Sequence, residues 1–290
     1  MELPVVVGVD GSDAGLRAVD WATDEAARHG LPLRLVYASR WERYDLGALV
    51  HGRDRRSGQE SAEDVVAAAA ERAGRRDPDV PVTTDALAED TVAALLAEGR
   101  RASMLITGSR GHGALTERLL GSVSLAVATR APCPVVVVRG DPDGTGGAHG
   151  TVLLGVPDAT HGPAAVEFAL REAAARGAEL DAVRTWRCPA HAGADHPRRP
   201  GDPCLPCEKE AATLVDAALD LFAARAGTVV RSSTVEGAPQ RVLQRRSADA
   251  DLLVVGTGRR AKSPDPHLGR TAHSVLHHAH CPVAVVPQPE

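Results

Sequence analysis

Short apolar runs, separated by amphipathic stretches, divide the first half of the chain into regular segments. The first run, residues 5–9, and the last, residues 135–138, consist mostly of valine, and residues 104–107 form a similar run. Continuous β-branched runs of this length are typical of strands buried on both faces of a parallel sheet. The full set of predicted strands comprises residues 5–9, 33–37, 80–86, 104–107 and 135–138.

The stretches between these runs have apolar residues at helical spacing. Ser12 is placed to cap the first helix, and Gly30 is placed to end it. Further helices are predicted from residue 61 onward, at 90–100 and around 125–128, with a mobile polar loop over 40–60. The order βαβαβαβαβ indicates an α/β fold with a doubly wound parallel sheet.

The same pattern begins again in the second half of the chain. Residues 151–156 repeat the first strand, and residues 281–286 repeat the Cys-Pro-Val pattern of residues 133–138. Residues 141–150 between the copies have the glycine and proline content of a linker. The sequence therefore predicts two tandem domains, residues 1–140 and 151–290.

Composition and charge narrow the class of protein. A chain of 290 residues is long enough for two cores, and 43% hydrophobic with 24% charged residues is typical of a soluble globular protein. Aromatic residues make up only 2%, so Ala, Val and Leu must build the cores. The net charge of -5, with no basic leader and no long apolar run, predicts a cytoplasmic protein with neither a nucleic-acid nor a membrane partner.

One glycine-rich stretch offers candidate chemistry. Residues 108–113 contain three glycines directly after the run at 104–107, and Gly121 precedes a predicted helix. Without a Cβ, glycine can adopt positive φ, and its N–H group can approach a bulky anion. The N-terminus of a helix favours phosphate, and Ser122 and Ser124 add hydroxyl donors. The alternative is a plain glycine-rich surface turn.

These motifs, in this order, resemble the universal stress protein family. The family's spaced motif Gly-x2-Gly-x9-Gly-Ser is matched by Gly108, Gly111, Gly121 and Ser122, together with residues 9–12 (Val-Asp-Gly-Ser) and 131–135 (Ala-Pro-Cys-Pro-Val). The likeness covers nearly the whole chain as a tandem pair. It implies two Rossmann-like domains of the adenine nucleotide alpha hydrolase type, each with a five-stranded parallel sheet.

The resemblance also implies a nucleotide site in the first domain. In the ATP-binding branch of the family, the ligand lies at the carboxyl ends of the strands. By position, Asp10 would face the nucleotide and Ala38 would lie near the adenine. The residues implied to surround the ribose and phosphates are Gly108, Ser109, Arg110, Gly111, His112, Gly121, Ser122, Val123 and Ser124. The implied ligands are ATP and Mg²⁺, and the alternative is a scaffold that binds no nucleotide.

The second copy departs from this motif at its key positions. Arg259 stands where Gly111 stands in the first copy, and Arg270 stands where Ser122 stands. Pro157 replaces Asp10. We therefore expect a degenerate site that serves pairing or regulation, with its basic residues either solvated or holding an anion through their side chains.

A cluster of cysteines and histidines is present only in the second copy. Cys188, His191, Cys204 and Cys207 have the residue types and two-residue gaps that suit a tetrahedral, structural Zn²⁺ site, with His196 as a spare ligand. The alternatives are a redox dithiol at Cys204 and Cys207 and an unliganded loop. Cys133 and Cys281 are expected to be buried small residues, and the histidines between 273 and 280 to be exposed.

We therefore expect a regulatory stress-response module in which ATP occupancy alters a surface for an unknown protein partner. No catalytic constellation is evident in the sequence, so any ATP hydrolysis should be slow. The resemblance also implies that residues 135–138 and 283–286 can pair, in a homodimer or in a pseudo-dimer within one chain. The alternatives are a zinc-dependent redox or metal sensor on a nucleotide-binding scaffold and a purely structural dimerisation module.

Overall fold

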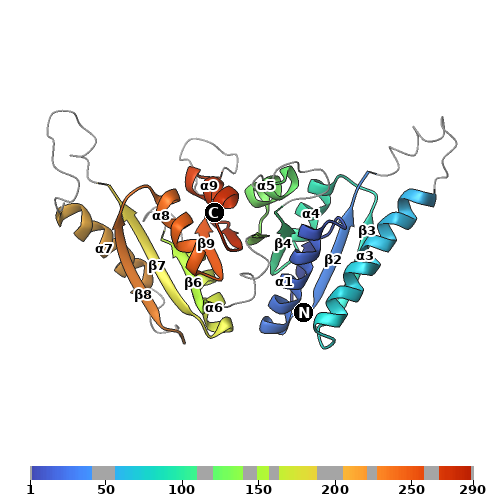
Figure 1. The fold of residues 1–290 in the computed structure, drawn as a ribbon, viewed down its shortest axis with the longest axis horizontal. Helices are drawn as coiled ribbons and strands as arrows, with labels where there is room; N and C mark the ends of the chain where they lie inside the picture. Colours follow the sequence, from blue (N-terminus) through green and yellow to red (C-terminus); the bar gives the residue numbers. More distant parts are fainter. Residues whose placement is uncertain are drawn as a thin grey trace. The chain divides into compact units, whose positions relative to one another are not determined.

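The structure is a computed structural model of the chain, and it divides into two compact units. Unit 1 comprises residues 1–146 and unit 2 comprises residues 147–290. The parts of the chain that the structure describes are residues 2–40, 56–109, 120–139, 149–156, 163–187, 205–220, 227–257 and 268–288. Each unit is a parallel sheet with helices on both of its faces (Figure 1). The predicted α/β fold is therefore confirmed.

Unit 1 alternates strands and helices in the predicted order. Its elements are β1 (Val5–Gly8), α1 (Asp13–His29), β2 (Leu33–Ala38), α3 (Arg56–Arg76), β3 (Val82–Leu87), α4 (Thr91–Gly99), β4 (Met104–Gly108), α5 (Ser122–Arg130) and β5 (Val135–Val138). The strand order is β3-β2-β1-β4-β5, and all pairings are parallel. The strand order reverses direction between β1 and β4, the position at which open α/β sheets bind ligands.

The ends of α1 follow from the local sequence. The Ser12 hydroxyl accepts a hydrogen bond from the backbone N–H of Gly15 at 3.1 Å, which caps the helix as predicted. Gly30 ends the helix with φ of 63°, a left-handed conformation that glycine adopts without steric cost.

Helix α3 begins earlier than predicted. It starts at Arg56, so the prediction of a loop through residue 60 and of a helix start at residue 61 was wrong. The Gln59 side-chain amide donates to Glu63 Oε1 at 2.8 Å, one helical turn further on, and this pairing supports the additional turn. The predicted loop over residues 41–55 lies outside the described residues.

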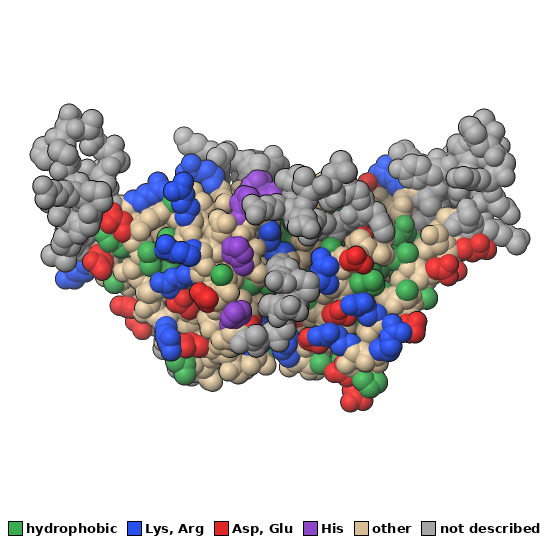
Figure 2. Space-filling model, viewed as in Figure 1, with side chains coloured by type: hydrophobic (Ala, Val, Ile, Leu, Met, Phe, Trp, Pro, Cys, Tyr) green, Lys and Arg blue, Asp and Glu red, His purple; other side chains and the backbone are tan. Residues whose placement is uncertain are grey.

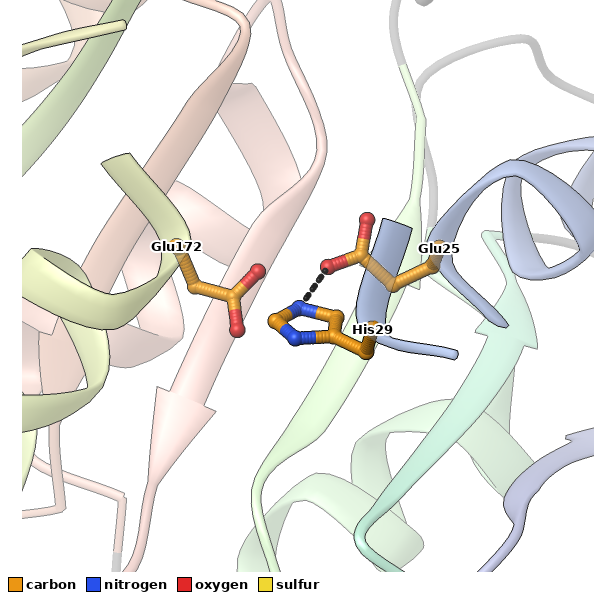
Figure 3. Close-up of side chains that lie close together, drawn as sticks. All are labelled: Glu25, His29 and Glu172. Carbon is orange, nitrogen blue, oxygen red and sulfur yellow. Dashed lines mark hydrogen bonds and ion pairs between the residues drawn. The ribbon is translucent and has the colours of Figure 1, made fainter. Parts of the chain in front are cut away.

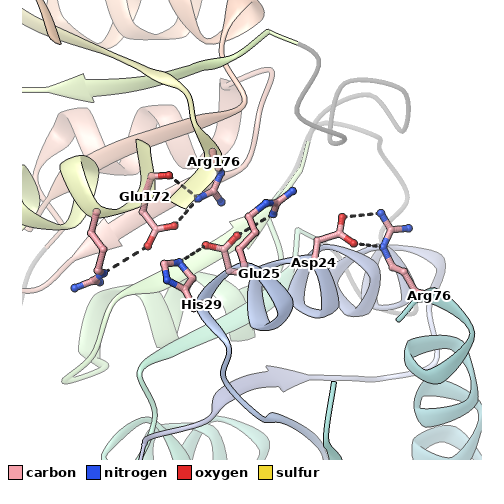
Figure 4. A network of polar contacts seen from close by, with 8 residues as sticks. Asp24, Glu25, His29, Arg76, Glu172 and Arg176 are labelled. Carbon is pink, nitrogen blue, oxygen red and sulfur yellow. Dashed lines mark hydrogen bonds and ion pairs between the residues drawn. The ribbon is translucent and has the colours of Figure 1, made fainter. Parts of the chain in front are cut away.

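Two ion pairs join α3 to α1 on the same face of the sheet. The guanidinium of Arg72 donates to both carboxylate oxygens of Asp20 at 2.6 Å. Arg76 pairs in the same two-pronged manner with Asp24, four residues further along both helices (Figure 4). Such bidentate pairs fix the relative register of two helices as well as adding energy.

Unit 2 repeats the topology of unit 1. Its elements are β6 (Thr151–Gly155), α6 (Ala164–Arg176), β7 (Glu179–Trp186), α7 (Leu205–Asp220), β8 (Val230–Glu236), α8 (Pro239–Arg246), a 3₁₀ turn (Ser247–Asp249), β9 (Leu252–Gly256), α9 (Arg270–His278) and β10 (Val283–Val286). The strand order is β8-β7-β6-β9-β10, again with parallel pairing. The internal repeat predicted from the sequence is therefore a repeat of the whole fold.

In the first helix of each unit, a glutamate lies five residues before the glycine that caps the helix C-terminus. In α1, Glu25 accepts from His29 at 3.2 Å, one turn further on, and the His29 ring is directed at this carboxylate (Figure 3). In α6, Glu172 pairs with Arg176 at 2.6 Å with the same spacing (Figure 4). The repeat thus extends to individual ion pairs within the helices.

The surface carries charges of both signs. Basic and acidic side chains alternate over the face shown in Figure 2. Within the part of the chain that is described, no helix is both long and apolar enough to cross a membrane.

Candidate functional site

A pocket of about 530 Å³ opens at the carboxyl ends of β1, β2 and β4 in unit 1. Residues from these strand ends and from the first turns of α1, α4 and α5 surround it. They are Gly8, Val9, Asp10, Gly15, Val36, Tyr37, Ala38, Ser39, Thr91, Leu95, Thr107, Gly108, Gly121, Ser122, Val123 and Ser124. The volume is within the range of about 300 to 1,000 Å³ that is usual for small-molecule sites.

Asp10, at the end of β1, is held by the turn that follows it. Its Oδ1 accepts from the backbone N–H of Ser12 at 3.0 Å and from the Ser12 hydroxyl at 2.6 Å. Gly11 adopts φ of 79° in this turn. A Cβ at Gly15 would lie 2.6 Å from Asp10 Oδ1, so α1 can begin this close to the carboxylate only with glycine at position 15. The local sequence therefore fixes one negative charge in the wall of the pocket.

Gly108, at the end of β4, is required for a reason that the sequence did not indicate. Its φ is not positive, so its conformation does not demand glycine. A Cβ there would instead lie 2.6 Å from the carbonyl oxygen and 2.7 Å from the carbonyl carbon of Ala14. The backbone of α1 packs directly over the backbone of β4 at this point. Gly108 lines the pocket, but its missing side chain makes room for α1.

Helix α5 presents its first turn to the pocket without a side-chain cap. Its N-cap residue is Gly121, with φ of -66°, which any residue can adopt. The Gly121 N–H donates to the carbonyl of Ser109 at 2.8 Å, which anchors the start of the helix. The first N–H groups of a helix have no acceptor within the helix, so those of Ser122 and Val123 can serve a ligand.

The two serines of this turn differ from each other. Ser122 is exposed and lines the pocket. Ser124 is buried, and its hydroxyl donates to the carbonyl of Gly108 at 2.7 Å. In this structure the single hydroxyl proton of Ser124 ties α5 to β4 and is not offered to the pocket.

The other predicted site residues are distributed as follows. Ala38 is the last residue of β2 and lines the pocket. Ser109 is buried and is not among the lining residues. Arg110, Gly111 and His112 lie outside the described residues. The structure therefore brings Asp10, Ala38, Gly108 and residues 121–124 together around one pocket.

Sequence reasoning did not identify several lining residues on β2, β4 and α4. Thr91, at the start of α4, donates its hydroxyl to the carbonyl of Ala38 at 2.6 Å and so fixes the rim of the pocket beside β2. Leu95 follows one turn later, with its methyl groups against Gly8. The spacing of Thr91 and Leu95 on one helical face was a usable signal, and so was the single hydroxyl of Thr107 at the end of the apolar run on β4.

Unit 2 has a smaller pocket, of about 280 Å³, at the equivalent position. Gly256 and Gly269 line it in place of Gly108 and Gly121, but Arg270 replaces Ser122. Ala272 stands at the position of Ser124 and has no hydroxyl to donate. Pro157 and Arg259 lie outside the described residues.

Most of the predicted zinc site also lies outside the described residues, namely Cys188, His191, Cys204 and the spare ligand His196. Cys207 is half-buried in the first turn of α7. On α9, the rings of His273 and His277 lie 4.7 Å apart between centroids. Cys133 and Cys281 are buried, as the sequence predicts, and burial raises the pKa of the Cys133 thiol to about 11.

Comparisons with known proteins agree with the tandem architecture. A profile of the universal stress protein family matches residues 2–139 and again residues 149–287. A universal stress protein of Mycobacterium tuberculosis is 31% identical over 294 residues, which cover 98% of this chain and 97% of that protein. The crystal structure of a universal stress protein from Archaeoglobus fulgidus DSM 4304 has 20% identity and a TM-score of 0.70, covering 99% of both chains. A putative universal stress protein from Pseudomonas aeruginosa UCBPP-PA14 has 18% identity and a TM-score of 0.63, covering 99% of this chain and 94% of its own.

Proposed function

Because the chain belongs to the universal stress protein family, we propose that unit 1 binds ATP in the pocket at the carboxyl ends of β1, β2 and β4. The observation that carries the proposal is the meeting, in one pocket, of the uncapped first turn of α5 and the fixed carboxylate of Asp10. The helix terminus suits phosphates and the carboxylate suits a hydroxyl or a cation. An apolar rim for a base lies opposite them.

The two ends of the pocket differ in character, in a way that matches the two ends of a nucleotide. Val36, Ala38 and Leu95 provide an apolar rim on the β2 and α4 side. The first turn of α5 lies on the β4 side, which is two strand spacings, or about 10 Å, from β2. We assign the adenine to the β2 side and the phosphates to the N–H groups of α5.

Asp10 fits a role in holding Mg²⁺ together with the phosphates. Protein sites usually bind Mg²⁺ through one or two carboxylates plus phosphate oxygens. Among the described residues, the hydrogen bonds to Asp10 all reach Oδ1. The second carboxylate oxygen is therefore assigned to the cation, which would neutralise the repulsion between Asp10 and the phosphates.

The biochemical role that follows is regulatory. Nucleotide occupancy would fix the first turns of α1, α4 and α5 against one another and so change the surface that unit 1 presents to a protein partner. We assign no catalytic residue, and any hydrolysis would be slow. Unit 2, with Arg270 at its smaller pocket, is proposed as a degenerate partner domain, with domain limits at residues 1–140 and 151–290.

Calorimetric titration of the full-length protein with ATP, once in the presence of Mg²⁺ and once in the presence of EDTA, tests this proposal. We expect saturable binding of one ATP per chain, weakened by about tenfold without Mg²⁺. Asp10→Asn keeps the acceptor for Ser12 but loses the charge, and should bind ATP with little dependence on Mg²⁺. Asp13→Asn is the matched control, since Asp13 is exposed in the first turn of α1 and does not line the pocket. Absence of ATP binding to the wild-type protein would refute the proposal, and unchanged Mg²⁺ dependence in Asp10→Asn would refute the role of Asp10.

A further inference from the structure

Thr107, the next-to-last residue of β4, has a buried hydroxyl to which the described residues offer no hydrogen-bond partner. The residue is 3% exposed, and among the described residues none donates to or accepts from its Oγ1. Comparable hydroxyls in the same unit are paired. Thr23 donates to the carbonyl of Val19 at 2.8 Å, and Ser124 donates to that of Gly108 at 2.7 Å. Because enclosed polar groups are nearly always paired in native proteins, the unpaired hydroxyl of Thr107 requires an explanation.

The Thr107 side chain points to the face of the sheet that α4 covers, where Leu95 also lines the pocket. Side chains alternate along a strand, and the missing side chain of Gly108 faces α1. Thr107 therefore faces the opposite side, together with its register partner Gly8, whose missing side chain faces Leu95 of α4. Thr107 also lines the pocket. Rotation about χ1 exchanges the directions of the Thr107 methyl and hydroxyl groups, so Oγ1 can turn toward a ligand without any backbone movement.

Unit 2 shows that the fold does not need a hydroxyl at this position. The equivalent residue of β9 is Val255, which has nearly the same shape as threonine and is also buried at the edge of the smaller pocket. Its Cγ1 lies 3.5 Å from the position of a Cβ on Gly155, the counterpart of Gly8. The hydroxyl is thus present beside the larger of the two equivalent pockets and absent beside the smaller one.

We propose that Thr107 is a ligand-binding residue of unit 1 whose hydroxyl donates a hydrogen bond to an oxygen of the ribose-phosphate part of the bound nucleotide. This assignment rests on the proposed binding of ATP. The ribose-phosphate part is favoured over the base because β4 lies next to α5, to which Ser124 ties it, and is separated from β2 by β1. The bound ligand supplies the hydrogen-bond partner that the described part of the chain does not provide.

The test is the exchange of the two equivalent residues in the full-length chain. Calorimetric titration with ATP should show about tenfold weaker binding to Thr107→Val, the loss expected for one hydrogen bond. Thr107→Ser keeps the hydroxyl and should bind within about twofold of wild type. Val255→Thr, the matched control in unit 2, should leave ATP affinity unchanged.

Thermal unfolding of the same variants without ATP gives a second readout with the opposite sign. Thr107→Val replaces an unpaired hydroxyl by a methyl group, so its unfolding temperature should equal or exceed that of wild type. Val255→Thr buries a new hydroxyl and should unfold at a lower temperature.

The outcomes separate this proposal from the one on which it rests. Wild-type affinity in Thr107→Val would overturn the assignment of Thr107 while leaving ATP binding intact. A lowered unfolding temperature for unliganded Thr107→Val would also overturn it, because the hydroxyl would then serve the fold. Failure of the wild-type protein to bind ATP would remove both proposals.

Discussion

Replacement of Gly108 by alanine tests the close packing of the α1 backbone over β4. A Cβ at this position would lie 2.6 Å and 2.7 Å from the carbonyl oxygen and carbon of Ala14, and 3.0 Å from the backbone nitrogen of Gly15. All three obstacles are backbone atoms of α1, which cannot move without the whole helix. Gly256→Ala is the matched control, since the closest atom there, at 2.7 Å, is Nε2 at the end of the Gln288 side chain.

The expected cost follows from these contacts. Overpacking of a close-packed site typically costs about 1 to 3 kcal/mol, and rigid obstacles favour the upper end, about 3 kcal/mol. Alanine also reduces the conformational freedom of the unfolded chain, which returns about 0.4 to 1 kcal/mol at either position. We therefore expect Gly108→Ala to destabilise unit 1 by about 2 kcal/mol, whereas Gly256→Ala should change the stability of unit 2 by less than about 1 kcal/mol.

Urea denaturation followed by tryptophan fluorescence measures the two effects separately. The chain has three tryptophans, and Trp21 is buried on α1 of unit 1 whereas Trp186 lies on β7 of unit 2. Trp41→Phe combined with Trp186→Phe leaves Trp21 as the single reporter of unit 1, and Trp41→Phe combined with Trp21→Phe leaves Trp186 as the single reporter of unit 2. Following each unit by itself avoids treating a two-domain transition as one step. Equal free-energy changes for the two glycine variants would show that α1 does not constrain position 108.

Three further predictions concern other side chains. Ser124→Ala removes the hydroxyl that donates to the carbonyl of Gly108 and should lower the free energy of unfolding of unit 1 by about 1 to 2 kcal/mol. Ala272→Ser at the equivalent position of unit 2 is the control. An unchanged urea midpoint of unit 1 in Ser124→Ala would contradict the prediction. Because burial raises the pKa of Cys133 from 9.0 to about 11, the unfolded chain releases this proton first. The contribution of Cys133 to the free energy of unfolding should therefore be fully present below pH 9 and decline between pH 9 and 11, so the decline should be smaller in Cys133→Ala. Parallel pH profiles of stability for the wild type and Cys133→Ala would argue against this prediction. If the Cys/His cluster binds zinc, elemental analysis of the purified protein should find one zinc per chain, and Cys207→Ser should lose it; a wild-type protein free of zinc would exclude the structural zinc site.

Much of the fold follows from local sequence. The valine runs at residues 5–9 and 135–138 form buried strands because only a sheet covered on both faces buries such runs. Ser12 and Gly30 mark the ends of α1 because a cap and a left-handed terminus depend on residues within a few positions of each other. The start of α3 was misjudged because Arg56 and Gln59 are polar yet compatible with a helix, and polarity alone does not make a loop.

The glycine motif shows where such reasoning stops. The sequence placed Gly108 and Gly121 near one ligand, but it gave both of them a role in positive φ and phosphate approach. In the structure neither needs a positive φ, and Gly108 serves the packing of α1 on β4. The sequence also treated Ser124 as a free donor, although it is a tie between α5 and β4.

By itself, then, the sequence determined the alternation of strands and helices, which depends on residues that are near one another in the chain, and the tandem repeat, which is visible as one pattern that occurs twice. The tertiary structure decided what the individual pocket residues do. Gly108 meets Ala14 and Thr91 meets Ala38 only after strands and helices distant in sequence have packed together. The same packing encloses the Thr107 hydroxyl where no other described residue pairs with it. These roles depend on ångström-scale distances between separate elements, and no local pattern of residues encodes such distances.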